Sequence, residues 1–344
     1  MFFMNNEEKN HKSKNDTIID SKITPYGFKE NILWVIRRLL SRMDRDNDAN
    51  IKYIPKRFLV DANIKKELTL IFTGDWLDLR GKDIKLGKQL KKFIRNSDYF
   101  IINLEKLITE ENIWRKEHLH KPSIIETITE LFAPEKTVIS LANNHAGDGG
   151  KEKLEETLNM IEARGFNIIG LRNKPYIDLY DDFRIVGATK WSNLTCEYIV
   201  PFDSASIALK DNSFNILFPH WGYEFELFPR NEDVELARSY AEQFDAIIGH
   251  HSHCPQPVNI DTIQDKEKLV AYSLGTFCSV RKAVPYKYGI LLKVNFGRDS
   301  LNQWKIRKIK WTATKCSNFA RKSCKVEIIK KLPFFKGKSS VYLS

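Results

Sequence analysis

Short apolar runs alternate with segments of helical periodicity from residue 68 onward, and this order is typical of an α/β or α+β layered domain. The expected strands cover residues 68–73, 98–104, 138–142, 183–186, 214–218, 246–248, 269–273 and 289–294. Apolar residues at helical spacing predict helices over residues 26–43, 151–164 and 233–244. Residues 304–311 predict one more strand, which has a basic face.

The remaining segments lie on either side of this alternating region, which we predict to be the main domain over residues 67–297. Residues 1–22 are polar and aperiodic, so we expect a disordered tail, followed by an N-terminal helical extension over residues 23–66. The start of the chain lacks the features of a secretory signal, and residues 32–40 are too short and too charged to span a bilayer. We therefore expect a cytoplasmic protein with reduced thiols, because its five cysteines form no metal-finger or C-x-x-C spacing.

The net charge of +11 is concentrated at the C-terminal end of the chain. Residues 298–344, the predicted basic C-terminal strand and tail, contain 13 lysines and arginines and only two acidic residues. A basic segment of this kind can hold a polyanion or the inner membrane surface by Coulomb attraction and counterion release. A solvated edge hairpin with lysines on its wet face is an equally good explanation. Nucleic-acid binding is the weakest interpretation, because no recognised binding module accompanies the charge.

Polar residues suited to metal binding or proton transfer follow five of the expected strands. Loops at the carboxyl ends of strands converge on one crevice in layered α/β proteins, so these residues are expected to meet in space. They are Asp75; Asn103 and Glu105; Asn143, Asn144, His145 and Asp148; His220 and Glu224; and His250, His251 and His253.

Taken one at a time, most of these residues have a simpler explanation. Asp75 fits a turn or helix cap, Glu105 a surface carboxylate, and His220 a structural histidine. The cluster GHHSH is different, because three of the eight histidines of the chain fall within four residues. We interpret His251 and His253 as metal ligands, whereas for His250 a ligand role and a position behind the ligands both remain open.

The combination of imidazoles and carboxylates indicates a divalent transition metal, one or two ions of Mn, Zn, Fe or Co, rather than calcium. Two such ions about 3.5 to 4 Å apart, bridged by a carboxylate, generate a hydroxide nucleophile and neutralise a phosphoryl transition state. A neighbouring histidine such as His145 could donate a proton to the leaving oxygen.

Six motifs in a fixed order carry a resemblance to a known family over roughly residues 67–295. They are GDW at Gly74, NLEKLIT at Asn103, LANNHAGDGG at Leu141, HWGYEFELFP at His220, GHHSH at Gly249 and YSLGTF at Tyr272. The set resembles the bacterial capsule-synthesis family of the CapA/PgsA type, which is known from poly-γ-glutamate capsule production and related to the calcineurin-like metallophosphoesterases.

The resemblance implies a four-layer α/β/β/α sandwich with a dimetal-type crevice. It assigns metal ligands to Asp75, Glu105 as the bridging carboxylate, Asn144, His220, His251 and His253. It makes His145 the proton-donating acid next to the metal site. Asp148 and Glu224 are then supporting catalytic residues that orient the ligands. Three further residues support the ligands from behind without binding the metal: Asn103, Asn143 and His250.

The chain departs from the family pattern at several positions. Calcineurin-like enzymes usually carry Asp-x-His on the first strand, but here Leu77 follows Asp75 and Trp76, so one metal position lacks a ligand. Ser252 replaces the Pro of GHHPH, Thr276 replaces the Asn of YSLGNF, and Lys106 stands where a small residue is frequent. Family members are often membrane-anchored, and no anchor is expected here.

Two functions from different classes follow from these observations. The first is a metal-dependent phosphoesterase acting on a phosphorylated saccharide, a lipid-linked intermediate or an anionic polymer. The second is a capsule or exopolysaccharide assembly factor that keeps the fold and binds polymer without turnover. The missing first-strand histidine favours the second, and the retention of the other polar positions favours the first.

Overall fold

The computed structural model describes residues 25–40, 47–77, 79, 82–110, 119–320 and 323–335. The expected disordered tail over residues 1–22 lies outside this part of the chain, as do residues 41–46, which include the last three residues of the predicted first helix. Across the described ranges, no helix combines the length and the apolar character needed to cross a membrane.

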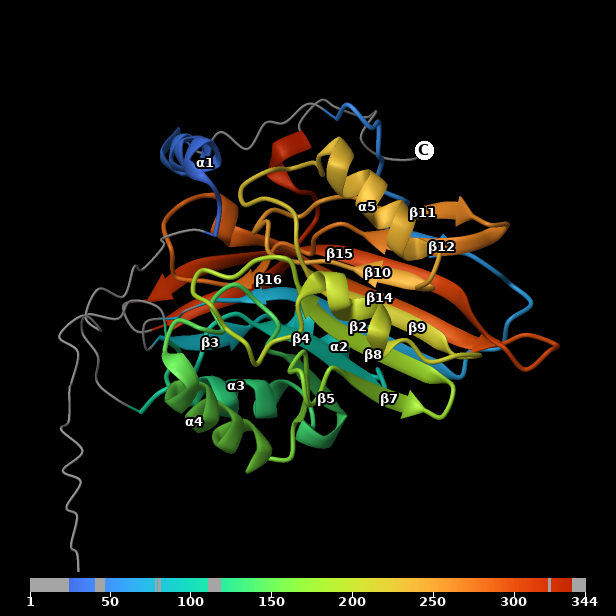
Figure 1. Cartoon of the computed structure of the whole chain (residues 1–344), viewed down its shortest axis with the longest axis horizontal. Coiled ribbons are helices and arrows are strands. Elements are labelled where there is room, and N and C mark those ends of the chain that lie inside the picture. The colour runs from blue at the N-terminus through green and yellow to red at the C-terminus, as the bar shows by residue number, and fades with distance from the viewer. Residues whose placement is uncertain are drawn as a thin grey trace, which may run out of the picture.

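Two mixed sheets form the centre of the molecule (Figure 1). In the described residues the larger sheet has ten strands in the order β3-β16-β15-β14-β2-β4-β5-β6, with β1 beside β15 and β13 beside β2. Its strands are β1 (Arg57–Leu59), β2 (Leu68–Trp76), β3 (Asp83–Leu86), β4 (Tyr99–Leu104), β5 (Thr137–Ser140), β6 (Asn167–Ile169), β13 (Thr276–Cys278), β14 (Tyr288–Arg298), β15 (Trp304–Ala320) and β16 (Ser323–Ile329).

The smaller sheet has six strands within the described ranges, in the order β11-β12-β10-β9-β8-β7. They are β7 (Tyr176–Tyr180), β8 (Phe183–Thr189), β9 (Phe214–His220), β10 (Ala246–Ile248), β11 (Val258–Ile263) and β12 (Lys266–Ala271). The run β8-β9-β10-β12 is parallel, as is β2-β4-β5-β6 in the larger sheet. Each sheet therefore gathers several strand carboxyl ends at one edge.

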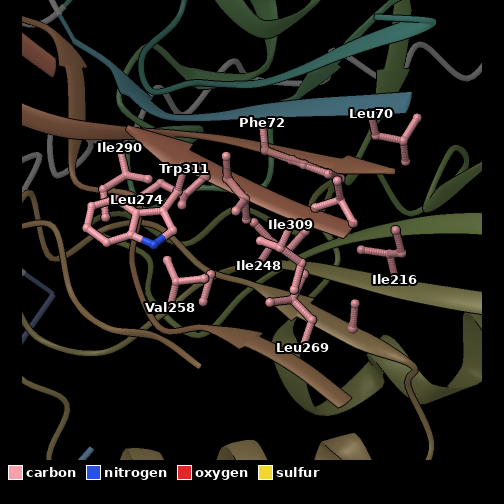
Figure 2. Packing of buried hydrophobic residues seen from close by; sticks show 14 of the residues in the cluster. Leu70, Phe72, Ile216, Ile248, Val258, Leu269, Leu274, Ile290, Ile309 and Trp311 are labelled. Atoms are coloured by element: carbon pink, nitrogen blue, oxygen red, sulfur yellow. The ribbon is translucent and has the colours of Figure 1, made fainter. Parts of the chain in front are cut away.

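The two sheets pack face to face through the main hydrophobic core (Figure 2). Leu70 and Phe72 of β2 and Trp311 of β15 point into it from the larger sheet, and Ile216 and Ile248 point into it from the smaller one. Ile71, between Leu70 and Phe72, faces the opposite side, as the two-residue period of a strand requires.

Helices cover the outer face of each sheet. On the larger sheet α2 (Lys88–Ile94), α3 (Ser123–Leu131) and α4 (Gly150–Glu162) share a second core with β2, β4 and β5. On the smaller sheet α5 (Asn231–Ala241) packs with β8, β9 and β10 in a third core. Figure 1 shows α3 and α4 on one side of the sandwich and α5 on the other. The expected four-layer α/β/β/α architecture is confirmed.

All eight expected strands of the alternating region are present, with ends shifted by a few residues, and so are the three expected helices, the first of them as α1 (Phe28–Leu40). The predicted strand over residues 304–311 is also present, as the first half of β15. The edge-hairpin explanation is wrong for β15, because this strand pairs with β14 on one side and with β1 and β16 on the other.

The segments outside the alternating region share its sheet and its core. The boundary expected between residues 297 and 298 falls inside β14, and β15 supplies Ile309, Trp311 and Ala313 to the core between the sheets. From the N-terminal side, Tyr53 and Ile54 join the same core. The basic lysines of β15 therefore stand on a strand that is built into the sandwich.

Candidate metal centre

The strand-end residues singled out by the sequence converge at one edge of the sandwich. Asp75 lies near the end of β2 and Asn103 near the end of β4, while His220 ends β9 and His250 follows β10 by two residues. Because these strands run parallel within their sheets, their carboxyl ends bring the side chains together. The predicted crevice therefore combines residues from both sheets.

Asp75 is the centre of this cluster and is fully buried. Its Oδ1 accepts a hydrogen bond from Asn103 Nδ2 at 2.8 Å, and its Oδ2 accepts one from the backbone N–H of His251 at 3.1 Å. His253 Nδ1 lies 3.0 Å from the same Oδ2. Burial opposes ionisation, but the hydrogen bonds of His250 and His253 outweigh it and hold the pKa of Asp75 well below its usual value.

Two groups of potential ligands share the Asp75 carboxylate. Asp75, His220 and His250 form one group, and Asp75, Glu105 and His253 form the other, each with its ligand atoms within 4.8 Å of one another. In this arrangement Asp75 is common to both groups, whereas the family resemblance gave the bridging position to Glu105. His250, whose role the sequence left open, belongs to the first group.

Several polar atoms of the cluster are buried without a hydrogen-bond partner among the described residues. They are both carboxylate oxygens of Glu105, Nε2 of His250 and Nδ1 of His251. An unsatisfied buried polar group costs about 1 to 3 kcal/mol, so natural folds keep few of them without a purpose. Imidazole nitrogens together with carboxylate oxygens match the preferences of divalent transition metals, and the residues present fit such an ion.

The charge states of the cluster also suit a cation. Without a cation, burial together with the nearby Asp75 charge raises the pKa of Glu105 well above its usual value, and a bound cation would oppose this shift by favouring the carboxylate. Burial lowers the pKa values of His220, His250 and His251, so these imidazoles are neutral near pH 7 and keep a lone pair for coordination.

Asparagines hold the imidazole of His220 on the side of β5. His220 Nε2 lies 2.9 Å from Asn144 Oδ1, and its Nδ1 lies 2.7 Å from His250 Nδ1. Asn143 donates to Leu104 O at 3.0 Å and to Asn103 Oδ1 at 3.4 Å. The predicted supporting positions of Asn103 and Asn143 thus lie directly against the ligand groups.

His145 stands at the rim of the cluster, and its side chain is 13% exposed. Its Nδ1 lies 2.5 Å from Asp148 Oδ2, and its Nε2 lies 3.7 Å from Glu105 Oε1. Burial and the neighbouring Lys106 charge outweigh Asp148 and lower the pKa of His145 to about 4. The imidazole is therefore neutral at pH 7, and an incoming phosphate anion would favour its protonation.

His253 and Glu224 form the opposite rim. His253 Nε2 lies 3.6 Å from Glu105 Oε1 and 3.9 Å from Glu224 Oε2. Glu224 Oε2 in turn accepts a hydrogen bond from Trp34 Nε1 at 2.8 Å. With Nδ1 directed at Asp75, His253 keeps Nε2 facing the two glutamates.

The loop that carries the three histidines has an unusual backbone. His251 has a φ of 98° and His253 a φ of 55°, a region that residues other than glycine adopt rarely. Such conformations cost about 1 to 3 kcal/mol each and cluster at functional sites. The hydrogen bond from His251 N–H to Asp75 helps to hold the loop in this shape.

Sequence reasoning missed four residues that touch the site. Asn193 accepts a hydrogen bond from Asn144 Nδ2 at 3.0 Å, and its own Nδ2 lies 3.3 Å from His145 Nδ1. Lys106 is 1% exposed and acts on the charge states of Glu105 and His145. Tyr26 and Trp34 come from the N-terminal segment. Tyr26, Trp34 and Asn193 stand in no motif that suggests chemistry, whereas Lys106 lies in the NLEKLIT motif, where the sequence marked it only as a departure from the family pattern.

The first-strand position expected to hold a histidine is occupied by Leu77, which is 1% exposed and donates its backbone N–H to Cys278 O. Position 77 therefore supplies no side-chain ligand. His250 approaches Asp75 from the other sheet instead, with its Nδ1 3.4 Å from Asp75 Oδ1.

Comparison with known families gives a match that covers more than half of the chain. The model of the family described as "Bacterial capsule synthesis protein PGA_cap" matches residues 69–177 and 204–280. All the candidate ligands lie inside these two ranges, whereas Tyr26, Trp34 and Asn193 lie outside them.

Two curated relatives are similar over more than half of the chain. The chain is 24% identical over 226 residues to the "PGA biosynthesis protein CapA" of Bacillus subtilis (strain 168), with 58% of this chain and 57% of that protein covered. It is 24% identical over 251 residues to the "Capsule biosynthesis protein CapA" of Bacillus anthracis, with 62% and 60% covered. The matches thus span less than two thirds of the relatives' length.

Solved structures give weaker similarities. The calcineurin-like phosphoesterase YfkN from Bacillus subtilis matches with a TM-score of 0.44 and 14% identity, covering 72% of this chain and 90% of that one. Vps29 from Chaetomium thermophilum matches with a TM-score of 0.28 and 10% identity, covering 72% and 98%.

Proposed function

The chain belongs to the bacterial capsule synthesis family PGA_cap, and from this premise we propose that it is a metal-dependent phosphoesterase of capsule or exopolysaccharide formation. The observation that carries the proposal is the buried carboxylate of Asp75, shared by two groups of potential ligands at one crevice. A shared carboxylate is the arrangement that a two-metal phosphoesterase requires.

A bound pair of divalent ions would supply a hydroxide nucleophile and neutralise charge on the phosphoryl group. The chain itself would hold the ions with Asp75, Glu105, His220, His250 and His253. Asn144 Oδ1, now 2.9 Å from His220 Nε2, and His251, whose Nδ1 is unpartnered among the described residues, complete the donor set.

We assign proton donation to the leaving oxygen to His145. Asp148 binds its Nδ1, so Nε2 is the nitrogen that faces the crevice beside Glu105. The position suits a group that gives a proton to the leaving oxygen once a phosphate anion has raised its basicity. Asn193 and Asp148 keep the ring in this orientation.

The family and the charge distribution support a proposal for the substrate class. The relatives' names associate them with capsule biosynthesis and PGA biosynthesis. We propose a phosphorylated saccharide, a lipid-linked intermediate or an anionic polymer as the substrate of this chain. Lys308 and Lys310 of β15 lie beside Arg57 of β1 and form a cationic group that suits contact with such a polymer or with an anionic membrane surface.

A second candidate function is a polymer-binding assembly factor without turnover. The observation that favours it is Leu77, which stands where calcineurin-like enzymes usually have a histidine ligand. Without that histidine, one metal position has only His250 as its additional imidazole ligand. Turnover assays separate this candidate from the enzyme.

The experiment measures metal content and turnover on the same preparations. Protein purified without chelator is analysed for Mn, Fe, Co and Zn, and hydrolysis of generic phosphomonoesters and phosphodiesters is then assayed with each ion. The double variant His251→Ala, His253→Ala should lose metal, since two imidazoles fewer cost several kcal/mol of affinity. His120→Ala is the matched control, because His120 contacts Trp76 O and belongs to neither ligand group. Metal without any turnover would favour the assembly factor.

A further inference from the structure

Residues 25–40, which we call the N-terminal strap, lie against the candidate metal centre. Tyr26 Oη lies 2.7 Å from His251 Nε2 and accepts a hydrogen bond from the backbone N–H of Glu224 at 3.0 Å. Eight residues further on, Trp34 Nε1 donates to Glu224 Oε2 at 2.8 Å. One short segment therefore contacts both a histidine and a glutamate of the site.

The strap is anchored by charge at its polar face. Arg37 of α1 forms an ion pair with Glu226 at 2.9 Å, and Glu30 forms one with Arg230 at 2.8 Å. The four side chains are between 4% and 15% exposed, so these pairs are shielded from solvent more than ordinary surface pairs. They fix α1 on the loop that carries Glu224.

Aromatic packing fixes the ring of Tyr26. Its centroid lies 5.0 Å from that of Trp191 and 5.5 Å from that of Tyr223, and the residue is only 6% exposed. Trp191 also lies 6.3 Å from the ring of His251. These contacts hold the hydroxyl of Tyr26 in a fixed position next to Nε2 of His251.

The two ring nitrogens of His251 have different surroundings. Nε2 is engaged by Tyr26, whereas Nδ1 is buried and has no hydrogen-bond partner among the described residues. Histidines that bind metals through one nitrogen almost always use the other in a hydrogen bond, which sets the tautomer and the ring orientation. In this chain the hydrogen-bonding partner would be a phenol rather than the more common carboxylate or carbonyl.

We propose that Tyr26 is a positioning residue that orients His251 so that its Nδ1 binds the divalent metal ion. This inference rests on the metal-binding part of the proposed function. The residues matched by the family model begin at 69, so the strap lies outside the matched ranges. The N-terminal segment then completes the metal centre from a distance of 225 residues in sequence.

The test is the metal affinity of Tyr26→Phe, which keeps the ring and its packing but removes the hydroxyl. Zn²⁺ and Mn²⁺ are titrated into metal-free full-length protein in competition with a chromophoric chelator. We expect affinity to fall about 10- to 100-fold for the ion bound by His251, the usual loss when such a partner is removed. Tyr240→Phe is the matched control, because its hydroxyl donates to Phe202 O on the far side of the smaller sheet.

Amide hydrogen exchange over residues 28–40 is measured on the same variants. Weakened binding with unchanged protection of α1 supports a role of the hydroxyl in orienting His251. Weakened binding with lost protection would overturn the proposal, because the hydroxyl would then hold the strap and not the imidazole. Equal affinity in Tyr26→Phe and wild type would also overturn it, while absence of metal from wild type would instead refute the proposed function.

Discussion

Replacement of Glu105 by glutamine should stabilise the metal-free protein and weaken its response to metal. The Glu105 side chain is fully buried, and neither of its oxygens has a hydrogen-bond partner among the described residues. It also faces the charge of Asp75, which adds to burial in raising its pKa well above the usual value. The buried Glu105 carboxyl group therefore destabilises the folded protein when no cation is bound.

The size of the effect follows from this environment. Glutamine keeps the shape of the side chain but carries no ionisable group, so it removes the cost of a buried carboxyl group that faces the Asp75 charge, about 1 to 3 kcal/mol. An unfolding entropy of about 2.1 cal/mol/K per residue gives roughly 1.5 °C of Tm per kcal/mol for a chain of this length, so Tm should rise by about 1.5 to 4 °C. In wild type, metal at 100 times its Kd adds about 2.7 kcal/mol, and the variant should lose most of that gain.

Thermal unfolding in chelator and with added Mn²⁺ or Zn²⁺ measures both effects. Glu156→Gln is the control, because the Glu156 carboxylate pairs with Lys153 and accepts a hydrogen bond from the backbone N–H of Glu110, away from both ligand groups. Loss of these partly exposed contacts should destabilise the protein by up to about 1 kcal/mol, with or without metal. A lower Tm for Glu105→Gln in chelator, or a metal response equal to that of wild type, would refute the reasoning.

Three further predictions concern catalysis, pH and charge. His145→Ala should lower kcat on a good phosphoester about 10²- to 10⁴-fold with unchanged metal content, and full kcat would contradict its role. Burial raises the pKa of Asp233 to about 6, so stability should fall as pH rises from about 4 to 6. Asp233→Asn should then be more stable than wild type by about 2 to 3 kcal/mol at pH 7 and similar near pH 4, as urea unfolding can show. Lys308→Glu with Lys310→Glu should abolish salt-sensitive cosedimentation with a polyanion, and binding equal to that of wild type would exclude this surface.

The sequence predicted the core of the fold because its strands carry a strong local signal. β2, β8 and β9 are buried on both faces, so most of their residues are apolar and apolar side chains occupy both faces of each strand. Two of the strands that were missed show the absence of this signal: β3 alternates between exposed and half-buried residues, and β13 has only three residues. Their pairing partners, β16 and β2, determine that they are strands.

The convergence of the site residues was predictable for a related reason. Polar residues that directly follow buried parallel strands must meet at one edge of each sheet, whatever the details of the loops. Asp75 and Asn103 illustrate this, since adjacent parallel strands place them in register and 2.8 Å apart. The sequence could therefore assign residues to the site before any distance was known.

The partner of each polar atom could not be predicted, and the loop GHHSH shows why. His250 Nδ1 meets His220, His251 Nε2 meets Tyr26, and His253 Nδ1 meets Asp75. These three partners come from β9, the N-terminal strap and β2, which are 30, 225 and 178 residues away from their histidines. The His-x-His spacing fixes which imidazoles are near one another, but the positive φ of His251 turns neighbouring rings toward different elements. The assignment of ligand atoms is therefore a property of packing, which brings residues from the whole chain to one loop.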